Sequence, residues 1–303
     1  MNNQVPNKRI PVILDTDIGS DIDDTWALAM LLKSPELDVR LVVTEGGDTT
    51  ARARIVARIL EIARRTDIPI GIGIPLDDHV MYHASWARDY SLATYPGRVC
   101  EDGVGAIVDT IMASAEPVTL IAIGPLPNIG AALQREPSIA ARARFVGMHG
   151  SIRRGYGGAA EPSPEYNVRA YSMASRKVFT APWPMTITPL DTCGLVRLTG
   201  ERYRAVRESN DPLARAVIEN YQIWLENNPN AKHLDGRVQS STLFDTVAVY
   251  LAFAEELLVM EELGIRVTGD GYTRVDDSAK RINCAVEWKD LEGFYDLLAD
   301  RLA

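Results

Sequence analysis

The sequence predicts a single α/β domain, built on a mostly parallel open sheet that is flanked by helices. Short apolar runs rich in β-branched residues alternate with segments of helical periodicity from residue 10 to residue 188. Strands that alternate with helices in this way are joined by right-handed crossovers and therefore lie parallel. The 303 residues also contain no linker, repeat or change of composition that would mark a second domain.

The predicted elements follow from these patterns in order. The first strand covers residues 10–14 and is followed by a helix that starts near Trp26. Further strands are predicted at 39–44, 68–74, 117–123, 145–148 and 184–188, and helices at 51–65, at 104–112, and ending near 135 and 178. The C-terminal part adds amphipathic segments at 199–209 and 211–227, a helix over 240–254, strands at 265–268 and 282–287, and a last helix from residue 290. Tyr221 and Trp224 lie on a helical stripe and are predicted to be packing residues.

Two stretches lack periodicity. Residues 75–103 carry several aromatic and histidine residues, among them His79, His83, Trp86 and Tyr95. A loop of this length in a compact domain is either a functional lid or disordered, and the aromatic content favours a lid. The second stretch, residues 149–167, is rich in glycine and proline.

The composition excludes several classes of function. A net charge of −9 argues against binding to nucleic acid polymers, which requires a basic surface. The three cysteines are far apart and lack CxxC spacing, so neither a disulfide framework nor a zinc site is predicted. No apolar signal segment or membrane-length run is present. We therefore expect a cytoplasmic protein that does not bind membranes, with residues 1–9 disordered.

The most informative stretch reads IPVILDTDIGSDIDDTWAL and covers residues 10–28. Its strand is followed by five aspartates within ten positions: Asp15, Asp17, Asp21, Asp23 and Asp24. They lie at the carboxyl end of a strand, where open α/β sheets bind their ligands. Carboxylates so close together repel one another unless a cation or protons intervene, and oxygen ligands suit Ca²⁺ or Mg²⁺. One or two could serve as turn residues or helix caps, but metal binding accounts for the whole group better.

These residues and three later segments resemble the inosine–uridine-preferring nucleoside hydrolase family. The segments are IAIGPLPNIGAAL at 121–133, EYN at 165–167 and TLFDTVAV at 242–249, and they occur in the family's order. The resemblance implies a Rossmann-like α/β sheet and a Ca²⁺-dependent hydrolase. Such an enzyme cleaves the N-glycosidic bond of ribonucleosides with a metal-activated water and releases ribose and a free base. It also implies a homodimer or homotetramer.

The resemblance further implies roles for individual residues. Asp17, Asp24, Asp245 and the backbone carbonyl of Ile123 would bind the metal, and Asp17 would also be the general base. Asp23 would hold a ribose hydroxyl. The remaining substrate-binding residues would be Asp48, Met148, Glu165, Tyr166 and Asn167. From its spacing alone, Asp245 could equally cap the helix that follows it, and Asn128 could cap its own helix.

The chain departs from the family pattern at several positions. Two extra residues in the aspartate motif introduce Asp21, which leaves the division of roles between Asp21 and Asp23 open. Asp48 stands where many relatives have asparagine, and an asparagine expected near residues 157–161 is absent. Phe244 occupies the position of a histidine that protonates the leaving base in several relatives. The candidates to replace that histidine as leaving-group acid, or to act from a lid, are His79, Tyr82, His83 and His233.

Two other functions compete with this interpretation. Asp15-Thr16-Asp17 resembles the DxD nucleophile motif of haloacid dehalogenase-type phosphatases, but the lysine and the second acidic pair of those enzymes have no convincing counterpart. Alternatively, the chain could be a catalytically impaired ribose- or nucleoside-binding protein, which Phe244 favours and Asp17 disfavours. The sequence leaves the preferred base open.

Overall fold

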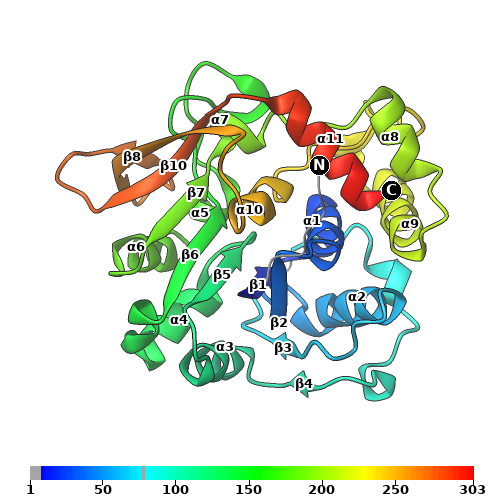
Figure 1. Ribbon diagram of the computed structural model, residues 1–303, viewed down its shortest axis with the longest axis horizontal. Helices are drawn as coiled ribbons and strands as arrows, with labels where there is room; N and C mark the ends of the chain where they lie inside the picture. Colours follow the sequence, from blue (N-terminus) through cyan, green and yellow to red (C-terminus); the bar gives the residue numbers. More distant parts are fainter. Residues whose placement is uncertain (1–7, 77–78) are drawn as a thin grey trace.

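The computed structural model describes residues 8–76 and 79–303 of the chain. Within them, a sheet has the strand order β4-β3-β2-β1-β5-β6-β7-β10-β8-β9 (Figure 1). Its strands are β1 (Ile10–Thr16), β2 (Leu37–Thr44), β3 (Ile70–Ile72), β4 (Val99–Cys100), β5 (Val118–Ala122), β6 (Ala143–Met148), β7 (Met185–Thr188), β8 (Leu258–Val267), β9 (Thr273–Val275) and β10 (Arg281–Trp288). The pairs from β4 to β10 are parallel, and β8 pairs antiparallel with both β10 and β9. The predicted mostly parallel α/β fold is confirmed.

The direction in which the chain crosses the sheet reverses beside β1. From β1 the chain proceeds outward through β2 and β3 to β4, and it then returns to the other side of β1 with β5, β6 and β7. The carboxyl ends of β1 and β5 therefore face a crevice that no crossover helix fills. In open α/β sheets this switch point is where ligands bind.

Helices cover both faces of the sheet. They are α1 (Asp23–Leu32), α2 (Thr49–Ile62), α3 (Gly103–Ala113), α4 (Pro127–Arg135), α5 (Tyr166–Ala170), α6 (Ser172–Thr180), α7 (Leu190–Cys193), α8 (Gly200–Arg207), α9 (Pro212–Asn227), α10 (Thr246–Leu251) and α11 (Leu291–Leu302). One core cluster joins the sheet to α1, α2, α8, α9, α10 and α11. The other joins the opposite face to α3, α4 and α6 (Figure 1). Tyr221 and Trp224 are buried in the first cluster, as predicted for packing residues.

The local sequence explains how the central unit forms. The apolar residues of β1 are buried on both faces, as expected for a central parallel strand. Trp26 at the start of α1 is fully buried and stacks on Tyr203, with ring centroids 6.4 Å apart. Asp23 and Asp24 form the acidic first turn of α1, where the helix dipole favours negative charge. The connection from β1 to α1 therefore gathers carboxylates at the ligand-binding edge of the sheet.

The predicted helix over 240–254 is wrong in its first half. Only Thr246–Leu251 form α10; residues 240–243 have no regular secondary structure and residues 244–245 form a turn. The backbone N–H of Ser240 donates to the Leu198 carbonyl at 3.0 Å, and the N–H of Leu243 donates to the Val196 carbonyl at 2.9 Å. These long-range bonds compete with the helical ones, and they could not be read from the periodicity of the segment.

The predicted lid over residues 75–103 is largely packed rather than free. Trp86 and Tyr95 are buried, and the Tyr95 hydroxyl donates to the Ile68 carbonyl at 2.9 Å. The aromatic residues of this segment therefore anchor it to the body of the protein. Residues 77–78 lie outside the described part of the chain, and of the described residues in the segment His79, Val80 and Tyr82 line the pocket at the ligand-binding edge of the sheet.

Most of the N-terminal segment expected to be disordered, residues 1–7, lies outside the described part of the chain. No helix in residues 8–76 and 79–303 has both the length and the hydrophobicity needed to cross a bilayer.

Candidate active site

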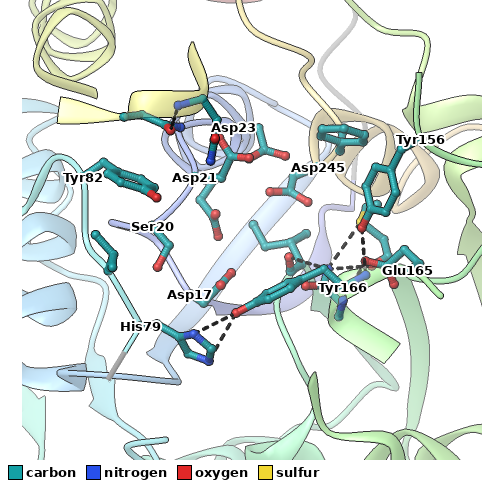
Figure 2. A pocket seen from close by; sticks show the side chains of 18 residues that line it. Asp17, Ser20, Asp21, Asp23, His79, Tyr82, Tyr156, Glu165, Tyr166 and Asp245 are labelled. Atoms are coloured by element: carbon teal, nitrogen blue, oxygen red, sulfur yellow. Dashed lines mark hydrogen bonds between the residues drawn. The ribbon is translucent and has the colours of Figure 1, made fainter. Parts of the chain in front are cut away.

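A pocket of about 460 Å³ opens at the switch point of the sheet (Figure 2). It is bounded by the carboxyl ends of β1, β5 and β6, by the start of α1 and by the residue that precedes α10. Its lining residues are Asp17, Ser20, Asp21, Asp23, Asp24, His79, Val80, Tyr82, Ile123, Met148, Tyr156, Glu165, Tyr166, Asn167, Asn228, Asn230, Phe244 and Asp245. Most of the predicted site residues thus come together from distant parts of the sequence.

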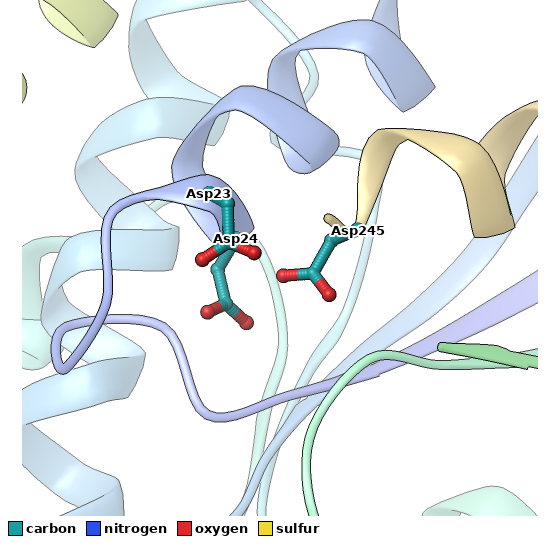
Figure 3. Close-up of side chains that lie close together, drawn as sticks. All are labelled: Asp23, Asp24 and Asp245. Atoms are coloured by element: carbon teal, nitrogen blue, oxygen red, sulfur yellow. The ribbon is translucent and has the colours of Figure 1, made fainter. Parts of the chain in front are cut away.

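Three carboxylates form a tight group on one wall of the pocket. Asp23, Asp24 and Asp245 each offer an oxygen, and these oxygens all lie within 4.8 Å of one another (Figure 3). All three residues are buried, and the most exposed of them, Asp23, is 4% exposed. Burial, followed by repulsion from the neighbouring aspartates, raises the pKa of all three carboxyl groups well above the usual range. Such a group is unstable when fully ionised unless a cation lies among the oxygens.

Asp245 is not used as a helix cap. It occupies the N-cap position of α10, but its side chain accepts no hydrogen bond from the first turn of that helix. Its carboxylate instead points toward Asp23 and Asp24 (Figure 3). The capping alternative for Asp245 is therefore wrong.

Asp17 lines the same pocket and lies close to this trio. Its side chain is 7% exposed. Burial raises the pKa of Asp17, and the positive charge of Arg52 opposes the rise. The predicted carboxylate ligands were Asp17, Asp24 and Asp245. In the structure the oxygens that lie within 4.8 Å of one another belong to Asp23, Asp24 and Asp245, and Asp17 is not part of this group.

Asp15 faces a different environment. It is fully buried, and Asn128 Nδ2 donates to its Oδ1 atom at 2.7 Å. Burial raises its pKa to about 7, against the opposing effect of the Asn128 hydrogen bond. Asp15 does not line the pocket. It is therefore not placed to be the nucleophile of a phosphatase, and Asn128 holds Asp15 rather than capping α4, whose N-cap is Leu126.

Arg52 is a residue of the site that the sequence analysis missed. It is fully buried on α2 beneath the aspartate loop. Its guanidinium donates to the backbone carbonyls of Gly46 at 2.7 Å and Ile18 at 2.8 Å, to that of Asp17, and to Ser20 Oγ at 2.8 Å. The signal was present, because Arg52 precedes Ile55, Val56 and Ile59 on the apolar stripe of its helix.

Glu165 and Asn167 form the opposite wall with the ends of β5 and β6. The Glu165 carboxylate accepts from the backbone N–H groups of Asn167 at 2.7 Å, Gly150 at 2.9 Å and Val168 at 3.1 Å. Burial raises the Glu165 pKa to about 7, although these bonds oppose the rise. Asn167 Nδ2 donates to the carbonyls of Ile123 at 3.1 Å and Met148 at 3.0 Å. The Ile123 carbonyl thus faces the site.

Aromatic side chains enclose the rest of the pocket. Tyr156 and Phe244 contact each other edge to face, with ring centroids 6.3 Å apart. The Tyr166 hydroxyl lies 3.2 Å from the ring nitrogens of His79. Figure 2 shows His79 and Tyr82 on the side of the pocket away from Tyr156. Tyr156 was not predicted as a site residue, because the irregular segment that carries it has no periodicity.

Three of the predicted site residues do not reach the pocket. Asp48 is exposed and caps α2 by accepting the backbone N–H of Ala51 at 2.9 Å. His83 is fully buried, and its two ring nitrogens contact Asn220 Oδ1 and the Asp21 carbonyl. His233 is exposed, with Nδ1 3.0 Å from the Asn230 carbonyl. None of the three is among the lining residues.

The fold and the pocket together define an enzyme of the open α/β class, with acidic groups gathered at the switch point of the sheet. The chain belongs to the inosine-uridine preferring nucleoside hydrolase family, whose model matches residues 12–296. It is thus a nucleoside hydrolase, an N-glycosyl hydrolase, and the resemblance noted in the sequence is confirmed. The family is metal-dependent, in keeping with the acidic cluster.

Individual relatives agree with this assignment. The pyrimidine-specific ribonucleoside hydrolase RihA of Escherichia coli is 30% identical over 97% of this chain and 98% of that protein. The structure of a plant nucleoside hydrolase, the PpNRh1 enzyme, matches with a TM-score of 0.82 at 21% identity, over 97% of this chain and 99% of that chain. A purine-preferring ribonucleoside hydrolase from Gardnerella vaginalis matches with a TM-score of 0.79 at 20% identity, over 96% and 98% of the two chains.

Proposed function

We propose that this protein is a Ca²⁺-dependent hydrolase of ribonucleosides that releases ribose and a free base. The observation that carries the proposal is the buried trio of Asp23, Asp24 and Asp245, whose oxygens lie within 4.8 Å of one another. Burying three carboxylates together costs free energy that hydrogen bonds from their surroundings do not offset. A bound cation would offset it, and the site is therefore built for one.

The donor atoms fit calcium. Carboxylate oxygens from Asp24, Asp245 and Asp17 and the backbone carbonyl of Ile123 form an all-oxygen set, and Ca²⁺ prefers six to eight such ligands in flexible geometry. When bound, Ca²⁺ would supply open coordination positions for ribose hydroxyls and would lower the pKa of a water molecule.

Asp17 is the residue we assign as general base. It lines the pocket beside the trio and belongs to the oxygen set that would hold the ion, so a water on that ion would lie within reach of its carboxylate. It takes the proton of the attacking water as the water oxygen bonds to C1′ of the ribose. Departure of the base leaves positive charge at C1′, which the surrounding carboxylates stabilise.

The ribose is held by polar side chains on two walls. We assign to Asp23, in the first turn of α1, the role of accepting from a ribose hydroxyl, and to Glu165 and Asn167 contacts with the sugar from the opposite wall; all three line the pocket, which supports this assignment. Met148 and Tyr166 complete the contacts. A deoxyribonucleoside would leave one of these acceptors unpaired, so we expect ribonucleosides to be preferred.

Of the candidates for the leaving-group acid, His79 and Tyr82 line the pocket, whereas His83 and His233 do not. Phe244 itself offers no proton. Protonation of a leaving base therefore depends on His79 or Tyr82, if a given base requires it.

The test is an assay of ribose release from a panel of purine and pyrimidine ribonucleosides, with chelator and after calcium is added back. We expect release that chelator abolishes and calcium restores, and loss of release in Asp17→Asn. Tight nucleoside binding without release would instead support the impaired binding protein. The expected cytoplasmic location and homodimeric or homotetrameric state remain predictions, and light scattering of the purified chain tests the second.

A further inference from the structure

The pocket combines two features that point to the charge of the base. Six of its lining residues are acidic, namely Asp17, Asp21, Asp23, Asp24, Glu165 and Asp245. No lysine or arginine is among the described residues that line it. Arg52 lies behind the aspartate loop, and its N–H groups are used on backbone carbonyls and Ser20.

Most of these acids already have a role. In the proposed function Asp17, Asp24 and Asp245 serve the metal and the water, and Asp23 serves a ribose hydroxyl. The Glu165 carboxylate accepts three backbone N–H groups. Asp21 has no such role. It is exposed, and among the residues that the structure describes its Oδ1 atom accepts the N–H of the next residue, Ile22, at 2.8 Å and no other hydrogen bond.

Two buried side chains, His83 and Asn220, hold the backbone at Asp21 in place. The backbone carbonyl of Asp21 lies 3.0 Å from His83 Nε2, and His83 Nδ1 lies 3.0 Å from Asn220 on α9. His83 and Asn220 are both fully buried. This buried pair holds the loop so that Asp21 adds a negative charge to the pocket (Figure 2).

The second feature is the aromatic lining. Tyr82, Tyr156, Tyr166 and Phe244 all line the cavity, and Phe244 has no proton to donate to a leaving base. Aromatic faces combined with carboxylates attract organic cations, because the ring quadrupole and the negative charges act in the same direction. A neutral base gains only the apolar part of this interaction.

Cleavage of the C1′–N bond also favours a positively charged base. When the C1′–N bond breaks, its electron pair goes to the base nitrogen, and water supplies the hydroxyl to C1′ while its proton goes to Asp17. A neutral base would leave as an anion unless an acid protonates it. A base that carries a fixed positive charge receives the same electron pair and leaves as a neutral molecule. It needs no acid at position 244.

We propose that the preferred substrates of this pocket are N-ribosides whose base carries a fixed positive charge, such as N-ribosylpyridinium or 7-alkylpurine compounds. This inference rests on the proposed ribonucleoside hydrolase activity. It accounts for two features of the pocket together: Asp21 supplies attraction for the cation, and Phe244 supplies an aromatic side chain where no acid is needed.

The kinetic test compares matched pairs: 7-methylguanosine against guanosine, and nicotinamide riboside against uridine and inosine. Each kcat/KM is divided by the uncatalysed hydrolysis rate of the same compound, since the cationic ribosides are more labile in water. We expect the cationic member to be favoured by at least about tenfold after this correction. Equal or better use of the neutral ribosides would overturn the inference and leave the proposed function standing. If no riboside releases ribose, the proposed function itself fails.

A binding test separates attraction from reactivity. The 1-methylnicotinamide cation should inhibit at least about tenfold more strongly than neutral nicotinamide, and Asp21→Asn should lower this ratio by at least about threefold, because the other acidic and aromatic residues remain. Asp300→Asn, which removes an exposed charge from α11 outside the pocket, is the matched control and should keep the ratio. An unchanged ratio in Asp21→Asn would contradict the role of that residue.

Phe244→His provides an independent check. It restores a proton donor beside the base, so turnover of uridine and inosine should rise by about 100-fold relative to that of nicotinamide riboside. No relative gain in a folded Phe244→His protein would contradict the inference. If that variant fails to fold, the inhibitor comparison in the unmodified protein and in Asp21→Asn decides.

Discussion

The Nε2 atom of His83 lies 3.0 Å from the backbone carbonyl oxygen of Asp21. The imidazole is fully buried and is held from its other side by Asn220 of α9. Burial lowers the pKa of His83 to about 4, so the ring is neutral at physiological pH. His83 therefore supports the aspartate loop from outside the pocket. It was a candidate for the leaving-group acid, but it does not line the pocket in which the base would lie.

His83→Phe tests this relationship. Removing the imidazole leaves the Asp21 carbonyl and Asn220 without their buried partner, which should destabilise the protein by about 1–3 kcal/mol. Chemical denaturation measures the loss, and calcium affinity should fall with it because the loop carries the ligands. His233→Phe is the control, since His233 is exposed and should tolerate the change. A stable His83→Phe protein whose kcat alone collapses would show that the histidine acts in catalysis instead.

Arg52→Met removes the cation beneath the site. The variant leaves the carbonyls of Gly46, Asp17 and Ile18 unpaired and takes away the charge that opposes the aspartates. We expect a loss of about 3–5 kcal/mol in the free energy of unfolding, as for other buried charged groups that lose a partner. Urea denaturation of the metal-free protein measures it. Arg54→Met on the same helix is the control, and an equal loss there would show that the effect is not specific to the site.

Asp48→Ala separates two roles of that residue. Because Asp48 caps α2, its removal should cost about 1 kcal/mol of stability. Because it lies outside the pocket, KM for a ribonucleoside should stay the same. An increase in KM of tenfold or more without a change in stability would restore the predicted sugar contact.

The pH dependence of stability follows from the raised pKa values. In the metal-free protein, Asp23, Asp24 and Asp245 keep protons at higher pH than they would in the unfolded chain. The folded state therefore binds more protons than the unfolded state above the ordinary carboxyl range, and stability falls as pH rises through the raised pKa values. Calcium competes with these protons. The increase in Tm on adding calcium should thus be larger at about pH 8 than at about pH 6. An increase that is independent of pH would show that the trio does not bind the ion.

Much of the fold could be read from the sequence because its strands are buried on both faces. The apolar run of β1 and the helical stripe of α2 are local signals, and the ends of both elements lie within three residues of the predicted positions. The start of α10 is different. Ser240 and Leu243 bond to Leu198 and Val196, and no local pattern reports a contact across 40 or more residues.

The site residues differ in the same way: some have a local sequence signal, and others depend on contacts between distant parts of the chain. Asp23 and Asp24 were found because they follow a strand and begin a helix, and Asp245 was found through the family resemblance. Arg52 was missed, although it lies on the apolar stripe of its helix, because an arginine is seldom fully buried. His83 was misplaced because its burial depends on Asn220, which lies far along the chain. Asp48 illustrates the opposite case, in which a local role as N-cap outweighs the role implied by the resemblance.

The central claim is that buried carboxylates at the switch point hold a calcium ion that the hydrolase needs. The most direct test is calorimetric titration of calcium into the chelated protein, with ribose release from a cleaved riboside followed in the same samples. We expect one ion per chain, release that rises in proportion to bound calcium, and at least about 100-fold weaker binding in Asp245→Asn. Full ribose release from protein that binds no calcium would contradict the account.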